Sequence, residues 1–203
     1  MGLAASRMEK RLALGTALLA SQLPDAIWPY LLLTGAETVS IVPGDTAMTP
    51  LRFDSYPWSH SLLMVAVTGA MMGIVYKALG GASRAAVFCA GLAVSHWFLD
   101  FMTHRPDMPV APWSDLKLGL GMWNSVPLTV IVESLMYLGA VAFYARGRKM
   151  SIGFWILIGV LGVTYVTNVV GPPPPGVTPV ALSMVALVPL VWWWGNRVGV
   201  KGS

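Results

Sequence analysis

The sequence predicts an all-α protein, a polytopic helical bundle embedded in a membrane. Hydrophobic residues make up 56% of its 203 residues, charged residues only 11%, and its mean hydropathy is +0.67. Soluble domains carry about 25% charged residues. A helix needs roughly 20 apolar residues to cross a bilayer core, and about six segments meet this requirement, near residues 12–34, 58–79, 85–103, 127–145, 151–170 and 178–195. We therefore expect a single integral membrane domain over residues 1–203, with about six transmembrane helices.

The positive charges of the connecting segments predict the orientation of this bundle. Cytoplasmic loops retain Lys and Arg. If the N-terminus is cytoplasmic, most of the 13 basic residues lie inside, namely Arg7, Lys10, Arg11, Lys77, Arg84, Arg146, Arg148, Lys149, Arg197 and Lys201. Only Arg52, Arg105 and Lys117 then lie outside. We therefore expect a multi-pass protein of the cell inner membrane with both termini in the cytoplasm. Its net charge of +4 is spread over short loops, so we expect the lipid bilayer, and no nucleic acid, as a partner.

The first apolar segment, residues 12–34, contains Pro24 followed by Asp25. A proline inside a helix removes a hydrogen bond and kinks or ends the helix. Asp25 is then either the N-cap of a second helical piece or a functional carboxylate inside the membrane. The outer loop that follows, residues 37–56, is too polar to span a bilayer and long for a connector. We expect this loop to fold over functional residues.

The second segment, residues 58–79, begins beside Pro57 and carries His60 near its start. His60 is either a headgroup-level residue among aromatic anchors or a ligand that faces the interior of the bundle. Further along, Gly69 and Gly73 form a Gly-x-x-x-Gly pattern, which permits close approach of two helices. The pattern fits a contact within one chain and a contact in a homodimer equally well.

The third segment, residues 85–103, carries the strongest functional signal. His96, Asp100 and His104 are spaced i, i+4 and i+8, so on a helix they share one face with a drift of about 40° per step. Imidazoles and a carboxylate on one face can hold a metal ion, although His96 and Asp100 can also pair with each other. In the fourth segment, Glu133 is either a structural partner or a further functional carboxylate.

The last two segments, within residues 150–196, contribute little chemistry. No charged residue occurs between Lys149 and Arg197. We expect two supporting spans, joined by a stiff polyproline connector at residues 171–176.

In its short polar motifs the chain resembles the YdjM-like family of inner-membrane metal-dependent hydrolases. The resemblance covers roughly residues 12–140 and rests on Pro24-Asp25 late in the first span, Ser59-His60-Ser61 opening the second, and Ser95-His96-x-x-Leu99-Asp100 closing the third. It implies a divalent metal ion, zinc or manganese, held by Asp25, His60, His96 and Asp100.

This chain also departs from the family pattern. The family commonly has a histidine early in the first span, a second aspartate soon after the Pro-Asp pair, and a His-Arg pair before the second span. Here the first span has no histidine, the Pro-Asp pair leads into Ala26-Ile27-Trp28, and Asp54-Ser55-Tyr56-Pro57 stands in place of the His-Arg pair. The reduced ligand set favours one metal ion over two.

The function that the resemblance implies is metal-dependent hydrolysis in the outer, periplasmic half of the bilayer. The substrate would be a small or lipid-like molecule, such as a lipid-linked ester or phosphoester. Glu133 or His104 would then carry protons, and Arg105 would bind a phosphate or carboxylate, unless His104 and Arg105 belong to an exposed turn. Two other classes stay open: a small ion-coupled transporter or permease, and a non-catalytic membrane scaffold.

Overall fold

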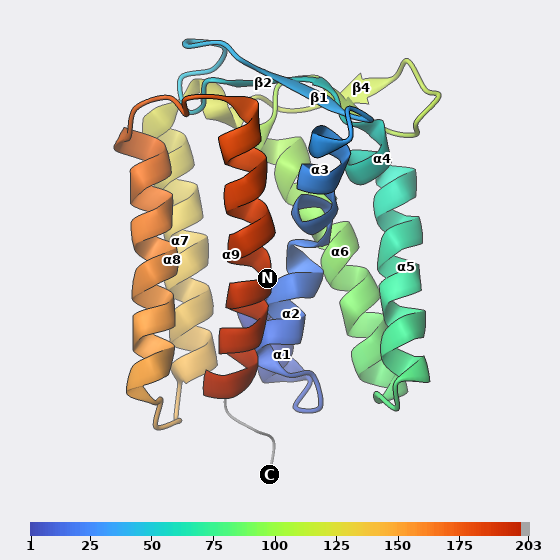
Figure 1. The fold of residues 1–203 in the computed structure, drawn as a ribbon. Coiled ribbons are helices and arrows are strands. Elements are labelled where there is room, and N and C mark those ends of the chain that lie inside the picture. The colour runs from blue at the N-terminus through green and yellow to red at the C-terminus, as the bar shows by residue number, and fades with distance from the viewer. Residues whose placement is uncertain (200–203) are drawn as a thin grey trace.

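The computed structural model describes residues 1–199 as a bundle of upright helices with short strands across one end (Figure 1). The helices are α1 (Gly2–Met8), α2 (Leu14–Ser21), α3 (Leu23–Leu33), α4 (Pro57–His60), α5 (Leu62–Ala78), α6 (Ser83–Thr103), α7 (Val126–Ala145), α8 (Ile152–Val170) and α9 (Val177–Val198). The strands are β1 (Thr38–Ile41), β2 (Leu51–Ser55), β3 (Met108–Pro109) and β4 (Lys117–Leu118), and the 3-10 helix η1 spans Met122–Asn124.

Four of the described helices, α6 to α9, are long and apolar enough to cross a membrane. Helix α5 is a shorter apolar helix, because the expected second segment is divided after His60 into α4 and α5. The expected first segment is likewise divided into α2 and α3 at Gln22, directly before Leu23 and Pro24. The chain therefore does not form six unbroken spans, because the first two expected segments are each divided into two helices. The first break lies beside Pro24, which lacks the backbone N–H that continues a helix, and the second lies at Ser61, whose hydroxyl caps the start of α5.

The chain begins with a helix that was not expected from its hydropathy. Helix α1 packs against α2 and α7, and it buries Leu3 and Ala5. The turn between α1 and α2 carries Glu9, which is buried and pairs with Arg84 at 3.2 Å. Helix α1 has seven residues, too few for a helical period to show in the sequence.

Helices α5 and α6 make the most extensive contact of the bundle, and glycines permit it. A Cβ atom added at Gly69 would lie 2.8 Å from the Cβ of Ala93, and one at Gly73 would lie 2.8 Å from the carbonyl oxygen of Ala86. The Gly-x-x-x-Gly pattern thus serves a contact within the chain. This close contact fixes the positions of the polar ends of α5 and α6 relative to each other.

The long loop between α3 and α4 folds back over one end of the bundle, as expected. Strands β1 and β2 form an antiparallel hairpin in which Val39 pairs with Phe53. Phe53 packs against Trp28 of α3, with ring centroids 5.4 Å apart, and against Tyr56. The hairpin therefore covers the end of the bundle at which α3, α4 and α6 meet (Figure 1).

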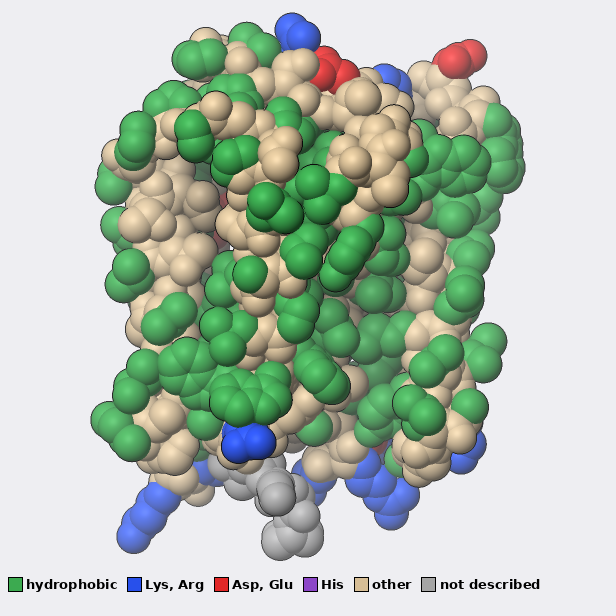
Figure 2. Space-filling model, in the orientation of Figure 1, with side chains coloured by type: hydrophobic (Ala, Val, Ile, Leu, Met, Phe, Trp, Pro, Cys, Tyr) green, Lys and Arg blue, Asp and Glu red, His purple; other side chains and the backbone are tan. Residues whose placement is uncertain are grey.

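Basic side chains gather at the opposite end of the bundle, below sides covered by hydrophobic side chains (Figure 2). That end holds the α1–α2 turn with Lys10 and Arg11 and the α7–α8 turn with Arg148 and Lys149. Lys201, which was expected at the same end, lies outside the described residues.

Candidate metal centre

Four polar side chains from three helices meet inside the bundle, beneath the β1–β2 hairpin. They are Asp25 of α3, His60 of α4, and His96 and Asp100 of α6, and we call them the His–Asp centre. The Nε2 atom of His60 lies 3.3 Å from Oδ1 of Asp25 and 3.9 Å from Oδ2 of Asp100. The Nε2 atom of His96 lies 3.7 Å from Oδ2 of Asp25 and 3.1 Å from Oδ2 of Asp100. These are the four residues that the resemblance implied as metal ligands.

The break between α2 and α3 orients His96. The last carbonyl groups of a helix have no partner within that helix, and Ser21 is the last residue of α2. Its carbonyl oxygen accepts a hydrogen bond from Nδ1 of His96 at 2.9 Å. Because a carbonyl oxygen can only accept, Nδ1 of His96 carries a proton.

A buried carboxylate orients His60 through a serine. Glu37, which is 1% exposed, accepts hydrogen bonds from the backbone N–H groups of Trp58 and Ser59 at 2.7 and 2.9 Å. The hydroxyl of Ser59 donates to the second oxygen of Glu37 at 2.6 Å and lies 2.7 Å from Nδ1 of His60. Since the hydroxyl proton points to Glu37, the hydroxyl oxygen of Ser59 accepts a hydrogen bond from Nδ1–H of His60.

Because Nδ1 of each histidine bonds away from the centre, Nε2 is the nitrogen that each ring presents to the two carboxylates. In a neutral imidazole, protonation of Nδ1 leaves a lone pair on Nε2. The Nε2 atom of His96 is buried and has no hydrogen-bond partner among residues 1–199, although a carboxylate oxygen lies 3.1 Å away. Lone pairs that face carboxylate oxygens in a buried site require a cation between them or further protons.

The spacing of the ligand atoms fits a metal ion. Three ligand atoms, one each from Asp25, His60 and His96, all lie within 4.8 Å of one another. Zinc takes nitrogen and oxygen ligands at about 2.0–2.2 Å, so two ligand atoms of one ion lie at most about 4.4 Å apart. The four Nε2 to Oδ distances of the His–Asp centre, 3.1 to 3.9 Å, fall inside this limit. Asp25, His60 and His96 therefore form a possible site for a divalent cation, and Asp100 lies beside it.

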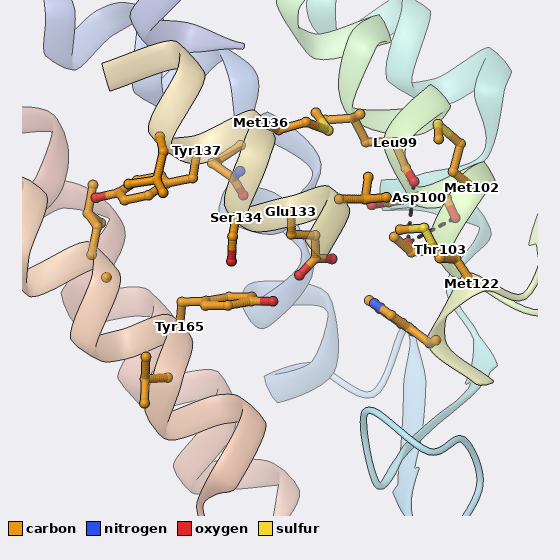
Figure 3. Close-up of a pocket in the computed structure, with 17 residues that line it drawn as sticks. Leu99, Asp100, Met102, Thr103, Met122, Glu133, Ser134, Met136, Tyr137 and Tyr165 are labelled. Carbon is orange, nitrogen blue, oxygen red and sulfur yellow. Dashed lines mark hydrogen bonds between the residues drawn. The ribbon is translucent and has the colours of Figure 1, made fainter. Parts of the chain in front are cut away.

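Glu133 lies apart from the His–Asp centre but lines a cavity that reaches it. The cavity has a volume of about 520 Å³ and lies between α6, η1, α7 and α8 (Figure 3). Asp100 and Glu133 both line it, from α6 and α7 respectively. The hydroxyl of Tyr165, on α8, is turned toward the Glu133 carboxylate.

His104 and Arg105 belong to a second polar network under the hairpin. Nδ1 of His104 lies 3.1 Å from Oδ1 of Asp107, to which the hydroxyl of Tyr56 donates a hydrogen bond at 2.6 Å. Burial alone would raise the pKa of Asp107, but hydrogen bonds from His104 and Tyr56 outweigh it and hold this pKa below its usual value. Arg105 donates to Asp107 at 3.0 Å and to Asp45 at 2.6 Å. This network ties the loop after α6 to the loop before β2.

Comparison with known proteins places the chain in a family. The sequence profile of the YdjM inner membrane protein family matches residues 1–172. The chain belongs to the YdjM inner membrane protein family. It is a multi-pass protein of the inner membrane, and the family match extends from α1 to the end of α8, beyond the motifs near residues 12–140. No curated protein and no solved structure matches the chain.

Two residues that orient the histidines were missed in the sequence of this YdjM family member. Ser59 directly precedes His60, so the sequence shows that the two residues are close. It does not show the hydrogen bond between the Ser59 hydroxyl and Nδ1 of His60. Glu37 is 22 positions from Ser59, and only the fold of the hairpin brings the two together. The carbonyl of Ser21 left no signal either, because every residue has a carbonyl group.

Proposed function

We propose that this protein is a membrane-embedded metal-dependent hydrolase that holds one divalent ion, zinc or manganese, in the His–Asp centre. The observation that carries the proposal is the convergence of the Nε2 atoms of two histidines on two carboxylates inside the bundle. A divalent ion bound there supplies Lewis acidity, which activates water at neutral pH and polarises the bond to be broken. Two imidazoles and two carboxylates are available as donors to this ion. One of the carboxylates, that of Asp100, also lines the cavity.

Glu133 is the residue that we propose for proton transfer. It is the one acidic residue besides Asp100 in the cavity lining, so a substrate in the cavity lies between the two carboxylates. His104 is the alternative, because its ring packs on Trp123, which also lines the cavity, with centroids 4.4 Å apart. Arg105 uses two nitrogens for Asp45 and Asp107, and its remaining N–H groups are those we propose for a substrate anion.

The proposed reaction takes place in the outer half of the membrane. The end of the bundle that carries Lys10, Arg11, Arg148 and Lys149 would then be cytoplasmic, as the distribution of basic residues predicts. A membrane-impermeant maleimide tests this orientation, because Cys89 is buried and is the chain's single cysteine. In intact spheroplasts, an Asp115→Cys variant should be labelled and a Lys149→Cys variant should not; the reverse pattern would contradict the orientation.

Hydrolysis by a Glu133→Gln variant tests the assignment of roles. We expect wild-type protein, purified in detergent and loaded with zinc or manganese, to hydrolyse a p-nitrophenyl ester or bis(p-nitrophenyl) phosphate, and a chelator to stop it. We expect Glu133→Gln to retain the metal and to hydrolyse the substrate about 10²- to 10⁴-fold more slowly than wild type. Glu9→Gln, which alters a buried carboxylate at the other end of the bundle, is the matched control. An undiminished rate in Glu133→Gln would rule out this shuttle, and inactivity of metal-loaded wild type on both substrates would contradict the proposal.

A further inference from the structure

The cavity beside the His–Asp centre is mostly apolar. Its walls come from α6, α7 and α8, with Met122 and Trp123 of η1 at one end. Alkyl and thioether side chains supply most of the lining, among them Leu99, Met136 and Leu161. Its volume of about 520 Å³ falls within the roughly 300–1,000 Å³ of pockets that enclose small organic ligands.

The cavity opens toward the lipid-facing side of the bundle. Three of its lining residues from three different helices also lie at the outer surface: Met102 is 39% exposed, Leu138 61% and Val166 53%. These positions lie on helices that are long and apolar enough to span the membrane. A molecule within the bilayer therefore has a lateral route into the cavity.

The polar groups of the cavity are few and occupy distinct places on its wall. Asp100, Glu133 and the hydroxyl of Tyr165 project into it from three helices (Figure 3). Asp100 is shared with the His–Asp centre, where its Oδ2 atom lies 3.1 Å from Nε2 of His96. The hydroxyl of Tyr165 is buried and is turned toward the Glu133 carboxylate. A ligand that brings a polar atom to this pair can bond to both groups.

We propose that the cavity binds the alkyl chain of a bilayer amphiphile and places its ester or phosphoester group at Asp100 and Glu133. The inference rests on the proposed function and assigns its substrate class. An alkyl chain matches the apolar walls, and the lateral opening gives it access without leaving the bilayer. The polar head then meets the only carboxylates of the lining, next to the histidines of the His–Asp centre.

Glycines on α8 provide a matched pair of variants that test the proposal. Gly162 lines the cavity, and a Cβ atom added there meets no atom within 4 Å, so Gly162→Leu fills the space without forcing helices apart. Gly159, one turn earlier on the same helix, is equally open but does not line the cavity. Gly159→Leu therefore controls for the gain in helix propensity and in side-chain bulk.

The experiment is photolabelling of the full-length protein in phosphatidylcholine nanodiscs. The discs contain a phosphatidylcholine with a diazirine at the end of one acyl chain, and mass spectrometry locates the label. We expect label on cavity residues such as Met122 and Met136 in wild type and Gly159→Leu. Gly162→Leu should reduce it severalfold, Gly162→Ala should reduce it less, and label at the exposed Leu182 of α9 should stay constant.

The outcomes separate this inference from the proposed function. Equal labelling of the cavity in wild type and Gly162→Leu, or label confined to the outer surface, would overturn the inference. Metal content is measured in the same samples and does not depend on labelling. Metal without cavity labelling leaves the hydrolase proposal standing alone, whereas cavity labelling without metal supports a lipid site and contradicts the hydrolase.

Discussion

At the scale of single residues, the His–Asp centre depends on which nitrogen of each histidine carries a proton. The carbonyl of Ser21 and the hydroxyl of Ser59 accept hydrogen bonds from the two Nδ1 atoms, which leaves Nε2 of each ring facing the two aspartates as the nitrogen for a metal ion. An ionised group at membrane depth costs about 2.5–3.5 kcal/mol on insertion scales. One divalent cation neutralises both carboxylates and removes this cost. The same arrangement fixes the imidazole rings, which is the usual role of partners to metal-binding histidines.

Replacing Ser59 tests this orientation. Ser59→Ala removes the acceptor for Nδ1 of His60 and leaves Glu37 short of one donor, so His60 is free to rotate. We expect the affinity for zinc to fall about 10- to 100-fold, as for other partners of metal-binding histidines. Competition with a fluorescent zinc chelator measures it.

Ser61 provides the control for this prediction. Its hydroxyl accepts a hydrogen bond from the backbone N–H of Met64 at the start of α5, at 3.3 Å. Ser61→Ala should therefore lower the free energy of unfolding by about 1 kcal/mol and leave zinc affinity unchanged. Equal zinc affinities of Ser59→Ala and wild type would show that the Ser59 contact does not orient a ligand.

Much of the chemistry at this scale was predictable from residue types. Asp25, His60, His96 and Asp100 stood out because an ionisable side chain inside an apolar segment is costly and needs a partner. Glu37 did not stand out, since it lies in a polar loop, where a carboxylate is ordinary. Its burial follows from the hairpin, and sequence patterns do not fix where a loop of this length folds.

At the scale of elements, broken helices build the centre and unbroken helices support it. The break after Ser21 exposes the carbonyl that holds His96, and the start of α4 at Pro57 leaves the N–H groups of Trp58 and Ser59 free to bind Glu37. The bounds of α7, α8 and α9 were predicted closely. A long apolar segment in a bilayer must satisfy its backbone hydrogen bonds internally, and a continuous helix does so. The break beside Pro24 was less predictable, because a proline permits either a kink or a complete stop.

A larger residue at Gly69 tests whether the contact between α5 and α6 holds the centre together. Gly69→Leu would place side-chain atoms where Ala93 now packs, so α5 must move away from α6 and carry His60 with it. We expect a loss of about 1–3 kcal/mol in the free energy of unfolding, together with weaker zinc binding. Thermal unfolding in detergent and zinc titration measure the two effects.

The control for this variant lies on α6, at an exposed position away from the α5–α6 contact. Gly91 of α6 has no atom within 4 Å of an added Cβ, so Gly91→Leu should gain helix propensity and should not lower the free energy of unfolding. If Gly69→Leu bound zinc as tightly as Gly91→Leu, the α5–α6 contact would not position the histidines.

At the scale of the whole molecule, the bundle places a polar centre between a covered end and a lipid-facing cavity. The β1–β2 hairpin lies over the centre, and Phe53 packs on Trp28, which in turn contacts His60 edge to face. Asp100 connects the centre to the cavity between α6, α7 and α8. In the function that we propose, the hairpin keeps bulk water from the centre on one side and the cavity admits bilayer components on the other. This arrangement therefore favours an amphiphilic substrate that reaches the centre from the bilayer over a soluble substrate.

The metal content of purified protein tests the central claim most directly. We predict about one equivalent of zinc or manganese in wild type and a loss of this metal in His60→Ala and His96→Ala. His104→Ala is the matched control, because His104 pairs with Asp107 outside the His–Asp centre, and it should retain the metal. Absence of metal from wild type after incubation with zinc or manganese would contradict the account and leave a protonated His–Asp cluster. Retention of metal in both His60→Ala and His96→Ala would contradict it equally.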